Sequence, residues 1–210
     1  MTSPSFLTLA CVGLLALTSG SIQRSAAQGV PLIPAAAATV LLGESGGSRT
    51  GATSADVVLV EFFDYNCPYC KRLAPALQSL LQLDTRVAVI YKDWPILGET
   101  SVYASRMALA AEWQGKYLTV HNALISGPRL TSAAQVDAAL QTLGLDLKKL
   151  KQDEATHSAD IDERLARIDA QAHALGIRGT PGLFVGRQPV AGNADVAQLQ
   201  LAVAAARQSP

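Results

Sequence analysis

The chain has 210 residues, and its 17 Lys and Arg balance 17 Asp and Glu, so the formal net charge is zero. Without excess positive charge, and with only 5% aromatic residues, it lacks the electrostatic footprint and the stacking surface of a nucleic-acid-binding protein. Its 49% hydrophobic and 16% charged residues instead predict one well-filled globular domain, alone or with an insertion.

The N-terminal segment predicts export. Residues 6–18 (FLTLACVGLLALT) are apolar but too few to span a bilayer, and Ser25-Ala26-Ala27 supplies the small residues of a signal-peptidase site. We therefore expect a signal peptide over residues 1–27 and a mature chain that begins near Gln28. No Lys or Arg precedes the apolar run, which departs from this pattern, and the alternative is a buried N-terminal helix.

A lead-in and a strand–helix–strand unit follow. Residues 28–56 are rich in Pro, Ala, Gly and Ser, which predicts an irregular segment with a candidate edge strand at residues 40–42. The run of residues 57–63 (VVLVEFF) predicts a strand buried on both faces. Helical spacing from residue 68 to about residue 83 predicts a helix, which Pro75 should kink. Residues 87–91 predict a second buried strand, parallel to the first.

A helical block comes next. Residues 101–175 show only helical patterns. Ser132, with Gln135 three residues later, predicts one helix start, Asp146 predicts another, and Gly176 predicts the end of the block.

The chain then returns to strands. Residues 183–185 and 189–191 predict a β-hairpin, and residues 195–206 predict a final helix. This order of elements is typical of an α/β protein with a thioredoxin fold and an inserted helical domain. The expected boundaries are 57–99 and 176–208 for the thioredoxin-like domain and 100–175 for the insertion.

Cys67 and Cys70 stand where the first strand ends and its helix begins. The free N–H groups and partial positive charge of a helix N-terminus favour the thiolate of Cys67, the nucleophile of thiol–disulfide exchange. The cap position should expose Cys67, whereas Cys70, one turn inward, can resolve the mixed disulfide. We therefore predict a catalytic redox disulfide between Cys67 and Cys70. The third cysteine, Cys11, belongs to the predicted signal peptide.

Two other roles of the CxxC pair have less support in the sequence. A structural zinc site needs four ligands, and the sequence has neither a second CxxC nor a closely spaced histidine pair, since His121, His157 and His173 are scattered. A purely structural disulfide across so short a loop would constrain the unfolded chain little. We expect no metal ion and no cofactor.

Three motifs resemble one known family. Residues 60–70 (VEFFDYNCPYC) resemble the active-site stretch of the DsbA-like thiol–disulfide oxidoreductases of bacterial envelopes. The helical segment after residues 91–96 (YKDWPI) resembles that of the ScsC-related group, and Gly179-Thr180-Pro181 resembles the family's cis-proline loop. The resemblance covers about residues 56–208 and implies a periplasmic protein that makes or rearranges disulfides in exported proteins.

Glu61 lies six residues before Cys67 on the predicted central strand. The family often carries an acidic residue here, and a carboxyl group in an apolar site has a raised pKa that suits proton relay to the buried Cys70. The alternative is that Glu61 lies at an exposed strand end. Asp64 and Lys92 are better explained as a loop polar residue and a strand-end charge.

Two segments are predicted to contact the reacting disulfide or the substrate. The resemblance implies a cis Pro181 that faces the cysteines, which leaves the backbone of Thr180 to pair with a substrate segment; an ordinary trans bond is the alternative. We count Pro181 with the catalytic residues. Pro68 and Tyr69, between the two cysteines, are the further candidates for substrate binding.

Three functions are weighed. The first is an oxidase that introduces disulfides into exported proteins and is reoxidised by a DsbB-like membrane partner. The second is an isomerase or reductase of ScsC or DsbG type, kept reduced by a DsbD-like partner. The Pro-Tyr pair between the cysteines favours it, but residues 28–56 do not resemble a dimerisation stalk, so we expect a monomer. The third, a metal-handling or holdase module without enzymatic activity, is disfavoured because Met- or His-rich ligand sets are absent from the sequence.

Overall fold

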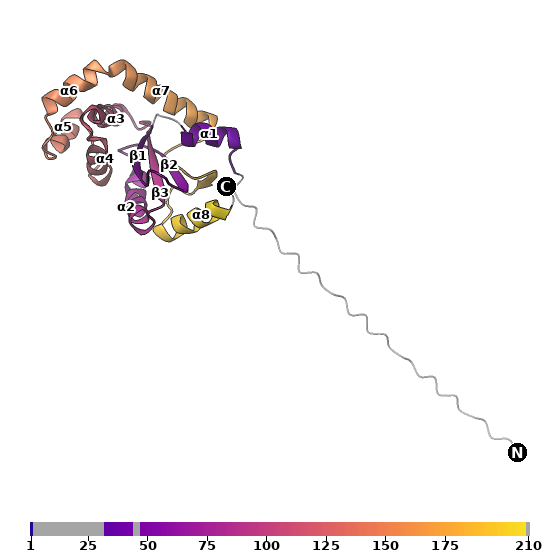
Figure 1. Ribbon diagram of the computed structural model, residues 1–210. Coiled ribbons are helices and arrows are strands. Elements are labelled where there is room, and N and C mark those ends of the chain that lie inside the picture. The colour runs from indigo at the N-terminus through magenta and orange to yellow at the C-terminus, as the bar shows by residue number, and fades with distance from the viewer. Residues whose placement is uncertain (2–31, 44–46, 209–210) are drawn as a thin grey trace.

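A mixed β-sheet forms the centre of the protein (Figure 1). The computed structural model describes residues 1, 32–43 and 47–208, so the predicted signal peptide, apart from Met1, lies outside the described residues. In this part of the chain the strands are β1 (Ser48–Gly51), β2 (Val57–Phe63), β3 (Val87–Asp93), β4 (Gly182–Val185) and β5 (Gln188–Val190). Their order is β1-β3-β2-β4-β5, with β2 and β3 parallel and every other neighbouring pair antiparallel.

Helices cover both faces of this sheet and form a lobe at one end of it (Figure 1). The helices are α1 (Ala35–Gly43), α2 (Pro68–Leu83), α3 (Glu99–Ala110), η1 (Ala111–Gln114), α4 (Tyr117–Ser126), α5 (Ala133–Gln141), α6 (Leu147–Thr156), α7 (Ser158–Ala174) and α8 (Val196–Gln208). Helices α2 and α8 pack on one face, and α1 and the end of α7 pack on the other. The protein therefore has the thioredoxin fold with helices inserted between β3 and β4.

The central strand β2 is buried on both faces, as its sequence predicts. Leu59 and Phe63 belong to the core that contains α2 and α8, whereas Val60 and Phe62 belong to the core that contains α1 and α7. This alternation follows from the two-residue period of a strand. Glu61 lies between Leu59 and Phe63, two residues from each, and so shares their face of the sheet. Its side chain therefore points toward α2 and the cysteines.

The predicted helix ends agree with the structure. Ser132 is the N-cap of α5 and accepts a hydrogen bond from the backbone N of Gln135, and Asp146 caps α6 in the same way through Lys149. Gly176 follows α7 with a φ of 70°, a left-handed conformation that glycine adopts without strain. The strand–helix–strand unit, the hairpin and the final helix are confirmed as well.

The prediction of an irregular lead-in with a strand at residues 40–42 is wrong. These residues lie in α1, where Leu41 and Ala38 are buried against the sheet. The alanine-rich start of this segment favours a helix, and burial of its apolar side chains on the sheet fixes it there. The edge strand of this region is β1, which pairs antiparallel with β3.

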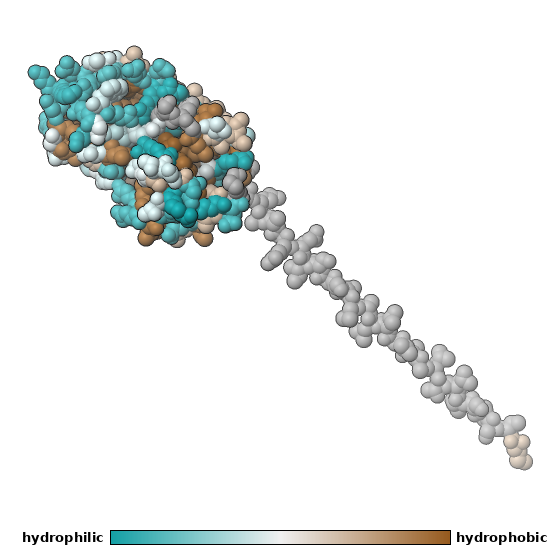
Figure 2. All heavy atoms as spheres, viewed as in Figure 1, coloured by the Kyte–Doolittle hydropathy of each residue, from teal (hydrophilic) through white to brown (hydrophobic). Residues whose placement is uncertain are grey.

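The inserted helices are not separate from the sheet. Ile168 and Ala172, in the second half of α7, belong to the same core as Phe62 and Trp94, and Trp94 Nε1 donates to Asp169 Oδ1 at 2.8 Å. Figure 2 shows a mainly hydrophilic surface over the far end of the helical lobe and apolar side chains nearer to α1. Among the described residues, no helix combines the length and the apolar character needed to cross a membrane.

Candidate active site

Cys67 lies at the junction between β2 and α2. It is the N-cap of α2, with extended backbone angles of φ −73° and ψ 117°, and Pro68 is the first helical residue. Proline suits this position because the first N–H groups of a helix have no partner within it. The cap geometry places Cys67 Sγ 3.4 Å from the backbone N of Cys70, which donates to the sulfur. The sulfur therefore lies at the positive end of the helix.

Hydrogen bonds to its sulfur lower the pKa of Cys67 to about 5. The hydrogen bond from the Cys70 side chain lowers this pKa most. The Thr180 side chain and the backbone N–H groups of Cys70 and Tyr69 lower it further, whereas burial of the sulfur raises it. Such a thiol is mainly thiolate at neutral pH. Cys67 is nevertheless only 3% exposed, so the expectation of an exposed cap cysteine is wrong. Thr180 lies against its sulfur.

Cys70 has the opposite character. It is fully buried, and burial, its hydrogen bond to Cys67 and the nearby Glu61 raise its pKa far above that of an ordinary thiol. It therefore keeps its proton where Cys67 does not. Both cysteines are free in the structure. The pair combines one acidic sulfur and one protonated sulfur, the asymmetry that thiol–disulfide exchange uses.

The Thr180–Pro181 peptide bond is cis, and its loop lies against the cysteine pair. The Cys67 thiol donates to the Thr180 carbonyl oxygen at 3.2 Å, which joins residues 113 positions apart. Sequence reasoning missed Gly192, which packs against this loop. A Cβ atom at Gly192 would lie 2.5 Å from Cγ of Pro181, so glycine is needed for the close approach. The only signal in the sequence is a glycine just after the hairpin.

Glu61 lies beneath the cysteines, with 1% of its side chain exposed. Burial raises its pKa to about 8, and the charge of Cys67 acts in the same direction. Among the described residues, its Oε1 atom has no hydrogen-bond partner. The carboxyl group is thus not at an exposed strand end, and it has the raised pKa expected of a proton relay.

Pro68 and Tyr69 are exposed beside the buried Cys67. Tyr69 is 53% exposed, and the Arg72 guanidinium lies 4.3 Å from the centre of its ring, a cation–π arrangement. These two side chains form a solvent-facing edge of the site that an incoming polypeptide can touch.

Asp64 and Lys92 differ from their predicted surroundings, because both are fully buried. Lys92 lies near the end of β3, as predicted, but its Nζ atom lies 3.3 Å from Oε1 of Gln171 on α7, so it is a buried contact between sheet and helix. The Asp64 carboxylate, in the loop before Cys67, accepts three hydrogen bonds, one from Asn66 in the same loop and two from Leu97 and Ser101 further along the chain. It is a loop polar residue, as predicted, but a buried one.

A polar cluster beside the cysteine loop joins α4 to the sheet. Tyr65 Oη lies 3.3 Å from Nδ1 of His121, and burial lowers the pKa of His121 to about 3, so this ring is neutral. Tyr117 donates to Asp93 Oδ2 at 2.6 Å, and burial raises the pKa of Asp93 to about 7. The sequence shows His121 only as one of three scattered histidines, and it does not single out Asp93, because nothing in the pattern marks a buried carboxyl group.

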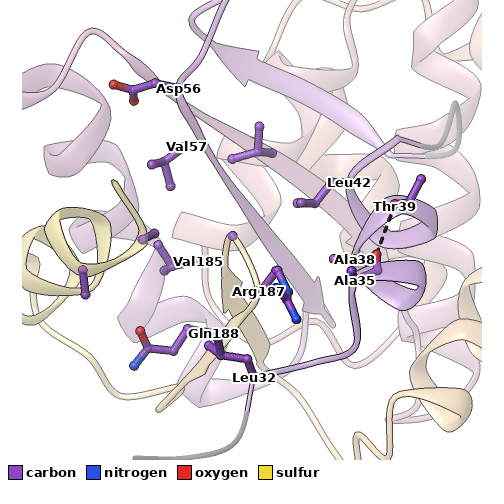
Figure 3. Close-up of a pocket in the computed structure, with 14 residues that line it drawn as sticks. Leu32, Ala35, Ala38, Thr39, Leu42, Asp56, Val57, Val185, Arg187 and Gln188 are labelled. Carbon is purple, nitrogen blue, oxygen red and sulfur yellow. Dashed lines mark hydrogen bonds between the residues drawn. The ribbon is translucent and has the colours of Figure 1, made fainter. Parts of the chain in front are cut away.

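One cavity lies away from the cysteines. It has a volume of about 480 Å³ and lies between α1, α8 and the β4–β5 turn, with Leu32, Arg187 and Gln188 on one side (Figure 3). It includes Val57 at the start of β2. The strand extends about 20 Å from there, at ~3.3 Å per residue, and Cys67 lies beyond its far end. Among the described residues, no group of three His, Cys, Asp or Glu side chains is arranged to hold a metal ion.

The DSBA-like thioredoxin domain family matches residues 58–204. The chain belongs to this family. A thioredoxin-like oxidoreductase from Silicibacter pomeroyi is similar to it, with 38% identity, a TM-score of 0.77, and coverage of 82% of this chain and 98% of that one. The thiol–disulfide exchange protein alpha-DsbA2 from Wolbachia pipientis gives 25% identity, a TM-score of 0.74, and coverage of 79% and 90%. The catalytic domain of ScsC from Proteus mirabilis gives 30% identity, a TM-score of 0.73, and coverage of 83% of this chain and 97% of that one.

The chain therefore carries a DsbA-like thioredoxin domain, of the kind found in a thiol–disulfide exchange protein. The chain is also similar to part of longer proteins named as Na⁺/H⁺ antiporters NhaA. In the antiporter of Salinispora arenicola the identity is 29% over 216 residues, which is 95% of this chain and 32% of that protein. The chain thus spans about a third of the length of the curated relatives it matches.

Proposed function

We propose that this protein is an oxidase that donates the Cys67–Cys70 disulfide to other proteins. The observation that carries the proposal is the position of Cys67 as N-cap of α2, where hydrogen bonds to its sulfur lower its pKa to about 5, beside a buried Cys70 that keeps its proton. Within the thioredoxin fold, thiol pKa values run from about 7 in thioredoxin to about 3.5 in DsbA, and the acidic end belongs to the strong oxidant. A stable thiolate favours the reduced enzyme and so favours transfer of the disulfide to the substrate.

The exchange proceeds in two steps. A substrate thiolate attacks Cys67 Sγ of the oxidised enzyme, so a mixed disulfide forms and the Cys67–Cys70 bond breaks, with Cys70 leaving as a thiolate that takes up a proton. The second substrate thiolate then attacks the substrate sulfur of the mixed disulfide. Cys67 leaves as a stabilised thiolate, and the substrate gains a disulfide.

Glu61 is suited to supply the proton that Cys70 takes up. Its carboxyl group is buried near both cysteines, and a pKa of about 8 keeps it protonated at neutral pH. A protonated acid in this position neutralises the leaving Cys70 thiolate without burying a second charge.

Thr180 and the exposed residues between the cysteines are suited to bind the substrate. The Thr180 carbonyl oxygen accepts from the Cys67 thiol, and it loses this donor when Cys67 becomes a thiolate or enters a disulfide. It can then accept an N–H group from an extended substrate segment, as in strand addition. Pro68 and Tyr69 would contact side chains of the same segment.

We also propose that the protein acts as a periplasmic monomer on exported proteins with cysteines. The apolar run at residues 6–18 and the small residues before Gln28 support export. A membrane protein of DsbB type would reoxidise it.

An isomerase or reductase role is the second candidate, with a DsbD-like partner that keeps the protein reduced. The similarity to the ScsC catalytic domain and the Pro68-Tyr69 pair favour it. Metal-handling and holdase functions are disfavoured, because the chain belongs to the DSBA-like family.

The reduction potential of the Cys67–Cys70 couple tests the proposed function. An oxidase requires a potential near that of DsbA, about −120 mV, whereas a value near that of thioredoxin, about −270 mV, would indicate a reductase. Equilibration with glutathione buffers and trapping of free thiols measure the potential. A value below about −230 mV would contradict the oxidase proposal.

A further inference from the structure

Buried side chains fasten the loop between β2 and α2 to the helical insertion. Asp64 and Ser101 are fully buried, and Asn66 and Leu130 are each 6% exposed. Ser101 lies in the first turn of α3, and Leu130 lies between α4 and α5. Three segments that are distant in the sequence therefore meet at this loop.

Asn66 makes two hydrogen bonds to the insertion. Its Oδ1 atom accepts from the backbone N of Leu130 at 2.8 Å, and its Nδ2 atom donates to Ser101 Oγ at 3.2 Å. The Ser101 hydroxyl donates in turn to Asp64 Oδ1 at 2.7 Å. A serine hydroxyl has one proton and two acceptor sites, so both of its bonds can be made at once.

Asp64 holds the loop from the other side. Its Oδ1 atom also accepts from the backbone N of Asn66 at 2.7 Å, and its Oδ2 atom accepts from the backbone N of Leu97 at 2.9 Å. The Asp64 carbonyl oxygen accepts from the backbone N of Cys67 at 3.0 Å. The backbone of Cys67 and of the residue before it is thus bonded to an aspartate that the insertion holds in place.

We propose that Asn66 and Ser101 are positioning residues, which fix the direction of Cys67 Sγ at the N-terminus of α2 by anchoring the loop to the insertion. The bond between this sulfur and the Cys70 N–H is 3.4 Å long, so a small rotation of the cap residue weakens it. The inserted helices would in this way control the reactivity of a cysteine that belongs to the thioredoxin fold. The inference rests on the proposed role of Cys67 as the attacking thiol.

Neutral substitutions separate positioning from charge. The ionisable groups near Cys67 are Cys70 and Lys71 on α2, Glu61 on β2 and Asp64 in the loop. Replacing Asp64 would remove a negative charge and so alter the Cys67 titration directly. Asn66→Ala and Ser101→Ala leave every one of these charges in place.

The test is the pH dependence of alkylation of Cys67 by iodoacetamide in the full reduced protein. We expect Asn66→Ala to raise the pKa of Cys67 by about one unit, the equivalent of one lost hydrogen bond. Ser101→Ala should shift it in the same direction. The double variant should shift it by less than the sum of the single variants, because the two side chains share one bond. Ser101→Ala gives an answer even if Asn66→Ala fails to fold.

Tyr103→Phe is the matched control. Tyr103 also lies on α3 and donates to Asp137 Oδ1 at 2.7 Å, but this bond lies within the insertion and does not reach the loop. Tyr103→Phe should therefore lower the free energy of unfolding without changing the pKa of Cys67. If Asn66→Ala and Ser101→Ala also leave the pKa of Cys67 unchanged, and that pKa is low, the proposed positioning role of the two residues is wrong. If Cys67 in the unmodified protein titrates as an ordinary thiol, the proposed function fails instead.

Discussion

The two cysteines differ in acidity because they occupy different positions in one helical turn. At the N-terminus of α2, hydrogen bonds from the Cys70 and Thr180 side chains lower the pKa of Cys67. Burial in the core and the nearby Glu61 raise the pKa of Cys70. The spacing in the sequence could predict that Cys67 caps the helix and that Cys70 lies one turn inward. It could not predict that Cys67 is buried, because the residues against it come from a loop 113 positions further on.

Glu61→Gln is expected to change how stability depends on pH. Burial raises the pKa of Glu61 from 4.5 to about 8, so between these values the folded protein holds a proton that the unfolded chain has released. Glu61 therefore makes the protein less stable as pH rises through this window, by up to about 1.4 kcal/mol per pH unit. Gln has no such dependence, so the variant should gain stability relative to the unmodified protein from pH 5 to pH 8.

Denaturant unfolding of the oxidised form, in which Cys67 carries no charge, measures this difference. The exposed Glu99→Gln is the control and should follow the unmodified protein across the same range. Parallel curves for Glu61→Gln and the unmodified protein would show that the carboxyl group is not held in an apolar site.

At the scale of elements, the loop around Pro181 depends on the segment after the hairpin. Gly192→Ala would place a methyl group 2.5 Å from Pro181 Cγ, so the loop around Pro181 must shift from its position against Cys67. We expect a loss of about 1–3 kcal/mol of stability from overpacking and a slower disulfide exchange. Gly179→Ala, in the same loop, is the control for stability, because a Cβ there meets no atom within 4 Å. Equal stability of the two variants in denaturant unfolding would refute the close approach.

Elements with a strong local pattern could be predicted, and α1 could not. The run of residues 57–63 and the helical spacing after Cys67 are confirmed as β2 and α2. Helix α1 is apolar on all sides, so no helical periodicity marks it, and only its packing against the sheet defines it. The bonds of Asn66 to Ser101 and Leu130 were beyond prediction as well, because nothing local to any of the three residues indicates the others.

Over the whole molecule, the inserted helices and the sheet act as one packed unit. Helix α7 covers part of the sheet, and the Tyr117–Asp93 hydrogen bond joins α4 to β3. The loop before Cys67 is bonded to two segments of the insertion. The thioredoxin fold and the insertion could be predicted from the order of elements and from the resemblance. Their close connection could not, because it depends on contacts between distant residues.

The acidity of Cys67 has a consequence for the stability of the whole protein. Its folded pKa, about 5, is far below the value of 9.0 for a free thiol, so the reduced protein gains stability as pH rises above 5 and loses it as pH falls through 5. At pH 7, two units above the folded pKa, the gain is about 3 kcal/mol. The oxidised protein has no thiolate, and its disulfide closes too short a loop to compensate fully.

Paired denaturant unfolding of the reduced and oxidised protein between pH 4 and pH 8 tests the oxidase account most directly. Reduced protein is expected to be the more stable form at pH 7, and the difference in unfolding free energy should shrink as pH falls toward 5. Burial of Glu61 is common to both forms and so largely cancels. An oxidised form that is clearly more stable at neutral pH would contradict the account and favour the isomerase or reductase role.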